Sequence, residues 1–473
     1  MLNGALGIAS RAPRLVVEER CSSAGWRLLQ WRAMKHPIMK IALLNRVPAR
    51  PLQLLKHIGR LADERGVAVY LVGGVVRDLL LKREILDLDL TVEEDGIAFA
   101  RLVADRCGAG LAVFERFATA RLAFPDGLKI DIATTRRESY AQPAVLPTVR
   151  PASIEEDLSR RDFTINAIAV RLNSHQFGRV LDPYGGQRDL RARMIRVMHA
   201  DSFQDDPTRI FRAIRFEQRF GFRLERITEG LLAQAASTDL IQGLSGPRLR
   251  NEIFLLFAER NPVRAIARMG RLRLLRFLHR RLRYTKDVQH VVAAVPKALV
   301  WWARRFPDSV IDRPIVYVMA LSSRSGPAVV DGMIRRLALS RPQAKNISNG
   351  GHRVDRVLKR LTEKETARPS QVYRLLVNFS DETLVLLLAK QMSAQHGARL
   401  VLLKRHLVAY VKNRSVKTAL TGRDLQAMGL QPGPQYKTIL ENLLDARIDR
   451  MIQTEADERA LVEKQLRARD VTC

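Results

Sequence analysis

A strand in which aspartate and leucine alternate constrains this chain more than any other feature. From Leu86 to Leu90 the sequence reads Leu-Asp-Leu-Asp-Leu. Because successive side chains of a strand point to opposite faces, Asp87 and Asp89 share one face and the leucines fill the other. Carboxylates provide the oxygen ligands that magnesium prefers. The pattern therefore predicts a site at Asp87 and Asp89 that binds two Mg²⁺ ions.

A glycine pair precedes this strand. Gly73 and Gly74 separate an expected strand over residues 67–72 from an expected helix over residues 75–82. Glycine lets a phosphate approach the backbone closely, and Arg77 lies one helical turn beyond, where a guanidinium can reach phosphate oxygens. A Gly-Gly turn and an Asp-x-Asp strand are each common when alone. Together they indicate metal-dependent chemistry on a nucleoside triphosphate, in which one ion lowers the pKa of an attacking hydroxyl and the other neutralises the leaving group.

Three further segments follow these two motifs. They are Arg160 to Ala167 (Arg-Arg-Asp-Phe-Thr-Ile-Asn-Ala), Asp182 to Gly186 (Asp-Pro-Tyr-Gly-Gly) with Asp189-Leu190, and Asp205 to Phe216 (Asp-Asp-Pro-Thr-Arg-Ile-Phe-Arg-Ala-Ile-Arg-Phe). In this order the segments resemble the motifs of class II tRNA nucleotidyltransferases and bacterial poly(A) polymerases, members of the polymerase β superfamily. The resemblance implies an α+β fold, with an N-terminal nucleotidyltransferase head on a mixed sheet and an all-α neck, body and tail after it.

The resemblance and the change to helical sequence after His199 divide the chain into four expected parts. These are an uncertain N-terminal extension over residues 1–45, a head domain over 46–200, a neck with the nucleotide-selecting motif over 201–270, and an RNA-binding body and tail over 271–473. Within the head, periodicity predicts helices over residues 52–64 and 96–107 and strands over 111–114, 118–124 and 129–133. Residues 136–157 contain three prolines without clear periodicity and are expected to form a loop.

The resemblance implies template-independent nucleotidyl transfer. An RNA 3′-hydroxyl attacks the α-phosphate of ATP or CTP, and pyrophosphate leaves. The residues expected to position the triphosphate are Gly73, Gly74, Arg77 and Arg161. The residues expected to contact the sugar or to orient neighbours are Asp162 and Asn166.

Asp131 is a candidate third carboxylate. It alternates with isoleucines in the expected strand over residues 129–133, so it points away from the apolar face. Two interpretations stay open: Asp131 is a metal or base residue beside Asp87 and Asp89, or it is a solvated strand position.

Asp206 and Arg209 are candidates for base selection. Adenine and cytosine present an exocyclic amine beside an unprotonated ring nitrogen, whereas guanine and uracil present a carbonyl beside a ring N–H. A carboxylate that accepts from the amine and an arginine that donates to the ring nitrogen therefore favour ATP and CTP. Alternatively, Asp206 only caps a helix that begins at Pro207. Arg212 and Arg215, on the same helix face, serve either the triphosphate or a stack of arginines.

The product stays open at this point. The form Asp205-Asp206-Pro207 departs from the Glu-Asp pattern common in CCA-adding members and is closer to members that add only the terminal A or only the two C residues. Addition of CCA, of CC and of A all remain compatible with the motifs. Poly(A) addition is an alternative, although no basic, aromatic stretch typical of that branch precedes the catalytic strand. An alternative from another class is a non-catalytic basic RNA-binding protein, against which the paired carboxylates argue.

The charge of the chain favours RNA as a partner. It has 80 Lys plus Arg against 49 Asp plus Glu, a formal net charge of +31. Arginine-rich stretches over residues 264–283 and 335–360 suit contacts to a phosphate backbone. Because only 6% of residues are aromatic, recognition of duplex shape and phosphates, as in a tRNA acceptor arm, fits better than extensive base stacking.

Cysteine usage and hydropathy bear on location. Cys21, Cys107 and Cys473 provide neither a disulfide framework nor zinc-ligand spacing, which indicates a reducing, cytoplasmic environment. No apolar run reaches the roughly eighteen residues of a membrane span, since Pro296 and Lys297 interrupt the longest candidate. No membrane partner is therefore expected.

The first forty residues are rich in arginine and poor in acids. Two interpretations stay open for them: an organelle transit peptide, or translation that begins near Met34 or Met39.

Overall fold

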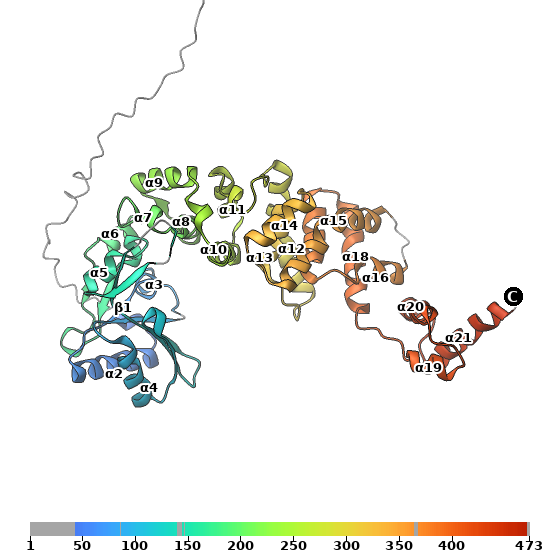
Figure 1. The fold of residues 1–473 in the computed structure, drawn as a ribbon, viewed down its shortest axis with the longest axis horizontal. Helices are drawn as coiled ribbons and strands as arrows, with labels where there is room; N and C mark the ends of the chain where they lie inside the picture. The colour runs from blue at the N-terminus through green and yellow to red at the C-terminus, as the bar shows by residue number, and fades with distance from the viewer. Residues whose placement is uncertain (1–42, 86, 140–143, 146, 364–367, 471–473) are drawn as a thin grey trace, which may run out of the picture. The chain divides into compact units, whose positions relative to one another are not determined.

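The computed structural model describes residues 43–470 apart from 86, 140–143, 146 and 364–367. The two interpretations of residues 1–40 therefore lie outside the described residues. The chain divides into two compact units (Figure 1). The head unit comprises Met1–Glu138, Val149–Arg191 and Val197–Ala200, and the helical unit comprises Ser139–Thr148, Ala192–Arg196 and Asp201–Cys473. The expected α+β fold class is confirmed, whereas the finer division into neck, body and tail stays a prediction.

A seven-stranded sheet forms the centre of the head unit. In spatial order its strands are β3 (Gly110–Phe114), β4 (Thr119–Ala123), β5 (Lys129–Thr134), β2 (Leu88–Val92), β1 (Val69–Val72), β8 (Ala169–Arg171) and β9 (Val180–Leu181). Strands β2 and β5 run parallel, and the other pairs of this sheet run antiparallel. The predicted mixed sheet is therefore confirmed, and each strand expected in the head is present within two residues of its predicted ends.

Strand β2 carries the alternation that defines the site. Leu88 and Leu90 are buried, whereas Asp87, directly before the strand, and Asp89 are exposed. The structure thus confirms the opposite facing of leucine and aspartate, while Leu86 lies outside the described residues.

Five α-helices lie in the described part of the head unit. They are α2 (Ala49–Arg65), α3 (Gly74–Leu80), α4 (Gly96–Cys107), α5 (Ile154–Ser159) and α6 (Gly186–Arg191). Helix α4 contacts β3, β4 and β5 through an apolar face that includes the buried Phe99 and Val103. Its first turn is capped by Asp95, whose carboxylate accepts from the backbone N–H groups of Ile97 and Ala98 at 3.0 Å each. Helix α4 thus covers the apolar face of these strands and leaves Asp89 of β2 exposed on the opposite face, which at β1 is covered by α5.

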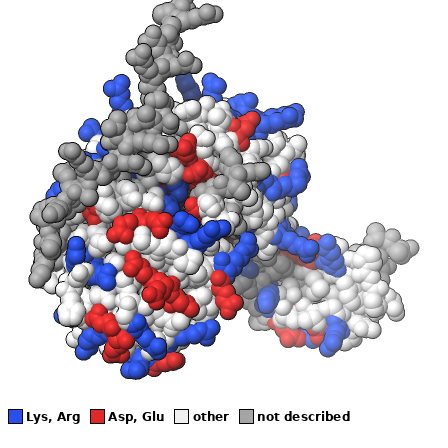
Figure 2. Space-filling view, turned by 60° about the vertical axis from the view of Figure 1, so that its left-hand side comes forward, with Lys and Arg blue, Asp and Glu red and all other residues white. Residues whose placement is uncertain are grey.

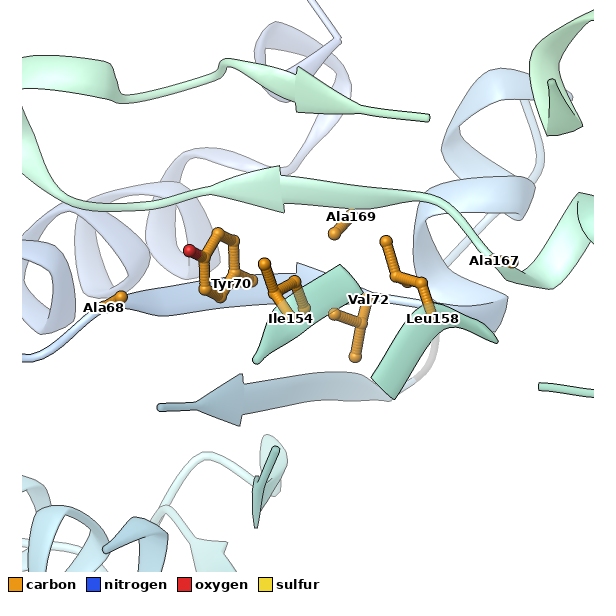
Figure 3. Close-up of a cluster of buried hydrophobic side chains, with 7 residues drawn as sticks. All are labelled: Ala68, Tyr70, Val72, Ile154, Leu158, Ala167 and Ala169. Atoms are coloured by element: carbon orange, nitrogen blue, oxygen red, sulfur yellow. The ribbon is translucent and has the colours of Figure 1, made fainter. Parts of the chain in front are cut away.

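A compact apolar cluster joins α5 to the sheet (Figure 3). Ile154 and Leu158 of α5 pack against Tyr70 and Val72 of β1. Helix α5 ends at Ser159, and Arg161, two residues later, lies beside the turn after β1.

The expected loop over residues 136–157 is wrong in part. The structure forms β6 (Arg136–Ser139) and β7 (Thr148–Pro151), which pair with each other, and α5 begins at Ile154. Four-residue strands are too short to show a period, and tertiary hydrogen bonds hold this region: Thr135 Oγ1 donates to the carbonyl of Ala152 at 2.6 Å. Helix α5 has a capping box of Ser153 and Glu156.

The helical unit contains only helices and one short strand pair among its described residues. The pair is β10 (Met194–Ile195) with β11 (Arg223–Leu224). The helices are α7 (Ser202–Asp205), α8 (Thr208–Phe220), α9 (Arg226–Ser237), α10 (Gly246–Ala258), α11 (Val263–Arg271), α12 (Lys286–Arg305), α13 (Arg313–Ser322), α14 (Pro327–Arg336), α15 (Arg341–Glu363), α16 (Pro369–Leu376), α17 (Asp381–Ser393), α18 (Gly397–Asn413), α19 (Gly422–Ala427), α20 (Pro434–Ile448) and α21 (Glu455–Asp470). The predicted helical remainder is confirmed.

Two further features bear on partners. In the part of the chain that the structure describes, no helix is both long and apolar enough to cross a bilayer. On the face that Figure 2 shows, acidic and basic side chains interleave. The net charge of +31 is therefore not gathered there into an unbroken basic surface.

Candidate active site

Strand register brings two carboxylates together at the centre of the sheet. Asp89 of β2 and Asp131 of β5 are direct partners in the parallel pair, and Asp87 immediately precedes β2. Although Asp89 keeps exposed surface, partial desolvation by the protein atoms around it raises its pKa, the negative charges of Asp131 and then Asp87 add to this rise, and the charge of Arg161 partly opposes it. A site where carboxylates repel one another is one that a cation stabilises.

The donor set suits Mg²⁺ in its chemistry. Asp87 and Asp89 offer hard oxygen ligands on one face. Among the described residues, no three Asp, Glu, His or Cys side chains cluster closely enough to form a complete metal site. The remaining ligands of an ion at Asp87 and Asp89 would therefore come from substrate phosphates and water, as is usual for Mg²⁺.

Asp131 forms an ion pair that the sequence did not predict. Arg121 of β4 lies opposite Asp131 in the antiparallel pair. Its Nε and Nη2 donate to the two carboxylate oxygens of Asp131 at 2.7 and 2.8 Å. Both oxygens of Asp131 are thus used by one guanidinium. The alternation of Arg121 within its strand was the only sequence signal for this residue, and its partner depends on register.

The turn after β1 depends on glycine. Gly73 has a φ of +72°, and a Cβ atom at this residue would lie 2.5 Å from Nη1 of Arg161. Glycine therefore permits the Arg161 guanidinium to approach the backbone closely, whereas the sequence predicted only a close approach by a phosphate. Helix α3 begins at Gly74, directly after this turn.

Arg161 is close to the glycine turn, and its charge acts on the carboxylate of Asp89. Its Nη2 donates to Asp157 at 2.9 Å, and its buried Nε has no hydrogen-bond partner among the described residues. Its positive charge lowers the pKa of Asp89. A partly exposed guanidinium that is incompletely paired is suited to bind an anion such as a triphosphate.

Asp157 anchors both arginines of the Arg-Arg-Asp segment. It is fully buried, and it accepts from Arg161 and from Arg160 Nη2, the latter at 2.6 Å. Burial favours protonation, but the charges of Arg161 and Arg160 outweigh it and lower the pKa of Asp157. The sequence around Asp157 did not predict this role, because a helical Asp next to two Glu residues resembles a solvated face.

Asp157→Asn is expected to lower the free energy of unfolding at pH 7 by about 3 kcal/mol, because it leaves two arginines near an uncharged group. Since the folded pKa lies below the unfolded one, the carboxylate's stabilisation is complete above pH ~4 and is lost as the pH falls through the folded pKa. The difference between wild type and variant should therefore shrink towards pH 3. Urea unfolding at both pH values measures it, with the exposed Asp105→Asn as control; a difference that does not depend on pH contradicts the assignment.

Arg77 lies in a buried network and not on an open surface. Its Nη1 donates to Asn166 Oδ1 at 2.6 Å, and its Nε and Nη2 donate to Asp78 at 2.9 and 2.8 Å. Asn166 in turn donates to Asp162 at 2.8 Å. The predicted residues Arg77, Asn166 and Asp162 are thus brought together, in an arrangement that orients α3 and the turn before it.

In the helical unit, Asp206 is held by several donors. Its Oδ1 accepts from the backbone N–H of Thr208 at 3.0 Å, from Thr208 Oγ1 at 2.7 Å and from Arg248 Nη2 at 2.9 Å. Helix α8 begins at Thr208, one residue later than predicted, so Pro207 precedes it. Asp206 therefore accepts from the first N–H group of α8, but Pro207 and not Asp206 occupies the N-cap position. Arg248 was missed, because its helix is adjacent only in three dimensions.

The arginines of α8 differ in their surroundings. Arg209 is buried, and its Nη1 donates to Ser202 at 2.7 Å. The guanidinium carbons of Arg212 and Arg215 lie 5.5 and 5.0 Å from the ring centroid of Phe216. Burial, followed by the charge of Arg212, lowers the pKa of Arg215. Arg212 and Arg215 thus form part of a stack on an aromatic ring.

Comparisons with known proteins agree with this geometry. Residues 69–196 match the model of the poly A polymerase head domain. The chain is 41% identical over 424 residues to an A-adding tRNA nucleotidyltransferase of Geobacter sulfurreducens, covering 88% of this chain and 47% of that protein. It spans about half the length of that relative.

Two other matches cover nearly whole proteins. An A-adding tRNA nucleotidyltransferase of Halalkalibacterium halodurans is 31% identical over 395 residues, covering 82% of this chain and 86% of that protein. A solved structure of the Thermotoga maritima CCA-adding enzyme complexed with tRNA is 33% identical, with a TM-score of 0.72, covering 91% of this chain and 99% of that one.

Proposed function

The chain belongs to the family of bacterial tRNA nucleotidyltransferases with a poly(A) polymerase-type head, and from this premise we propose that it adds nucleotides to the 3′ end of tRNA. The observation that carries the proposal is the alignment of Asp87 and Asp89 on the open face of the sheet, beside a glycine turn and Arg161. These are the groups that a triphosphate and its cations require.

In the proposed mechanism, Asp87 and Asp89 hold two Mg²⁺ ions. When bound, these ions lower the pKa of the RNA 3′-hydroxyl and offset the charge of the departing pyrophosphate. Arg161 binds the triphosphate beside Gly73. Arg77 supports the glycine turn through Asn166 and Asp162, and acts as a positioning residue that need not contact phosphate.

We propose ATP as the nucleotide and the terminal A as the product. The support is that two relatives that match more than four fifths of this chain, at 41% and 31% identity, are A-adding tRNA nucleotidyltransferases. Complete CCA addition from CTP and ATP is the second candidate, favoured by the likeness to the CCA-adding enzyme of Thermotoga maritima. Poly(A) addition has no comparable support. We place the enzyme in the cytoplasm, where Cys107 stays reduced.

One assay separates these products. tRNAs ending before the CCA tail, after one C and after two C residues are each offered labelled ATP or CTP, with Mg²⁺ or with EDTA, beside an unrelated RNA. We expect Mg²⁺-dependent incorporation of one A, only into tRNA that ends in CC. Incorporation of CTP into the shorter tRNAs would identify a CCA- or CC-adding enzyme, long A tails on every RNA a poly(A) polymerase, and no incorporation at all a non-catalytic RNA-binding protein.

Asp206→Ala is expected to reduce the preference for ATP over GTP by about 10- to 100-fold, because the purine amine loses its acceptor. Loss of the acceptor for the first N–H group of α8 should also lower the free energy of unfolding by about 1 kcal/mol. Steady-state kinetics with each nucleotide and thermal unfolding measure the two effects separately. If discrimination is retained while stability falls, Asp206 stabilises the start of α8 and nothing more.

A further inference from the structure

Four neighbouring strands, β2, β5, β4 and β3, share the open face of the sheet that bears Asp89. In register across the sheet, Asp89 of β2 is opposite Asp131 of β5, Asp131 is opposite Arg121 of β4, and Arg121 is opposite Ala112 of β3. Directly opposed residues share a face. Phe114, two residues beyond Ala112, therefore lies on the same face as the carboxylates.

Phe114 presents about half of its aromatic side chain to solvent. Its side chain is 49% exposed, and the alternating exposure of β3 places it on the side away from α4. An exposed ring on a polar sheet face offers a surface on which a planar group can stack.

Arg121 is held in place on this face. Its side chain is 51% exposed, although two of its nitrogens bind Asp131. The described residues provide no hydrogen-bond partner for its Nη1. A guanidinium fixed by a carboxylate along one edge keeps its other donors for an anion. Because both oxygens of Asp131 are engaged, this carboxylate acts as the holder of Arg121.

Sheet order separates two sides of the catalytic strand. The glycine turn and Arg161 lie by β1, on one side of β2, whereas β5, β4 and β3 extend on the other. In nucleotidyl transfer the attacking hydroxyl and the leaving pyrophosphate are in line, on opposite sides of the α-phosphorus. With the triphosphate at the glycine turn, the RNA 3′ end approaches over β5 and β4. At about 4.8 Å per strand, Arg121 lies about 10 Å from the Asp89 position.

We propose that Arg121 and Phe114 form the subsite for the last nucleotide of the RNA acceptor, with Arg121 on its phosphate and Phe114 stacked on its base. This subsite rests on the proposed function. A single-stranded 3′ end is the fitting occupant, because cations that follow a backbone and aromatic rings that stack on bases are the usual means of binding unpaired nucleotides. Asp131 is then a positioning residue.

Kinetics with the full chain test the subsite. Arg121→Met and Phe114→Ala should each raise the KM for tRNA ending in CC by about tenfold, the loss of one charge-assisted contact or one stacked base. The KM for ATP should stay within about twofold, and kcat should change less than the KM for RNA. The matched variant Phe114→Tyr should behave as wild type. Asp131→Asn should shift the KM for RNA in the same way as Arg121→Met.

A binding assay gives a readout without turnover. RNA with 2-aminopurine as its 3′-terminal base should lose fluorescence on binding the wild type and Phe114→Tyr, and should lose much less on binding Phe114→Ala. If the wild type transfers no nucleotide, the proposed function is wrong. The difference in fluorescence loss between the wild type and Phe114→Ala still tests whether the subsite exists.

Three outcomes would overturn the subsite. One is unchanged RNA KM and quenching in Phe114→Ala and Arg121→Met. Another is a rise in the KM for ATP alone in Arg121→Met, which would assign the guanidinium to the triphosphate. The third is loss of kcat in Asp131→Asn while Arg121→Met keeps its RNA affinity, which would make Asp131 a metal ligand.

Discussion

Asp87→Asn and Asp89→Asn are each expected to reduce nucleotide transfer by at least about 10³-fold, while the Kd for tRNA stays within about twofold. The carboxylates hold the ions that make transfer possible, whereas most RNA contacts are expected from other surfaces. Single-turnover transfer and filter binding measure the two quantities. Substantial transfer by either variant would refute the metal assignment.

The same variants allow a test that does not depend on activity. Partial desolvation and neighbouring carboxylates raise the pKa of Asp89, so its ionised form destabilises the fold at neutral pH without a cation. Stability linked to a raised carboxyl pKa is highest at low pH and falls as the pH rises through that pKa. Asp89→Asn should therefore have a higher Tm than the wild type in EDTA at pH 7. Mg²⁺ should raise the Tm of the wild type and leave the variant unchanged; equal Mg²⁺ effects would place the ion elsewhere.

Gly73→Ala is expected to have the second largest effect, raising the KM for ATP by at least about tenfold. The new Cβ atom would lie 2.5 Å from Nη1 of Arg161 at a residue with a φ of +72°. Either the turn or the guanidinium must move, and a misplaced positioning group is costly to a reaction that depends on alignment. Steady-state kinetics with ATP, together with unfolding by urea, measure the effect.

Gly66→Ala is the matched control. Gly66 has a similar φ of +68°, at the end of α2, and a Cβ atom there would meet nothing within 4 Å. This variant should lose about 1 kcal/mol of stability from backbone strain and keep its KM for ATP. If Gly66→Ala and Gly73→Ala have the same kinetics, steric contact with Arg161 is not important.

Local patterns predicted the catalytic strand and the glycine turn because each depends on a few adjacent residues. The period of two in β2 and the apolar period of α4 are direct consequences of backbone geometry. Both patterns hold in the structure because burial of one apolar face stabilises the strand and the helix. The same logic failed for residues 136–157, where strands of four residues and a six-residue helix depend on contacts with β1 and on hydrogen bonds such as that from Thr135 to Ala152.

Pairing between distant residues was the part that sequence could not supply. Arg121 on Asp131, Arg248 on Asp206 and Arg161 on Asp157 join groups by register or by helix packing. A chain with 80 Lys plus Arg offers too many cations for spacing alone to indicate which one meets which carboxylate. The partners of Asp131 and Arg77 are visible only once the chain is folded, and their roles stay predictions.

By itself, the sequence determined the chemistry of this protein: two carboxylates on one strand face and a glycine turn, because side-chain direction in a strand follows from the backbone alone. The tertiary structure decided what surrounds them. Strand order places the glycine turn on one side of β2 and Arg121 with Phe114 on the other, because neighbours in a sheet are chosen by packing and hydrogen bonding across the whole head unit. Which substrate approaches from which side is therefore a property of the fold, not of the motifs.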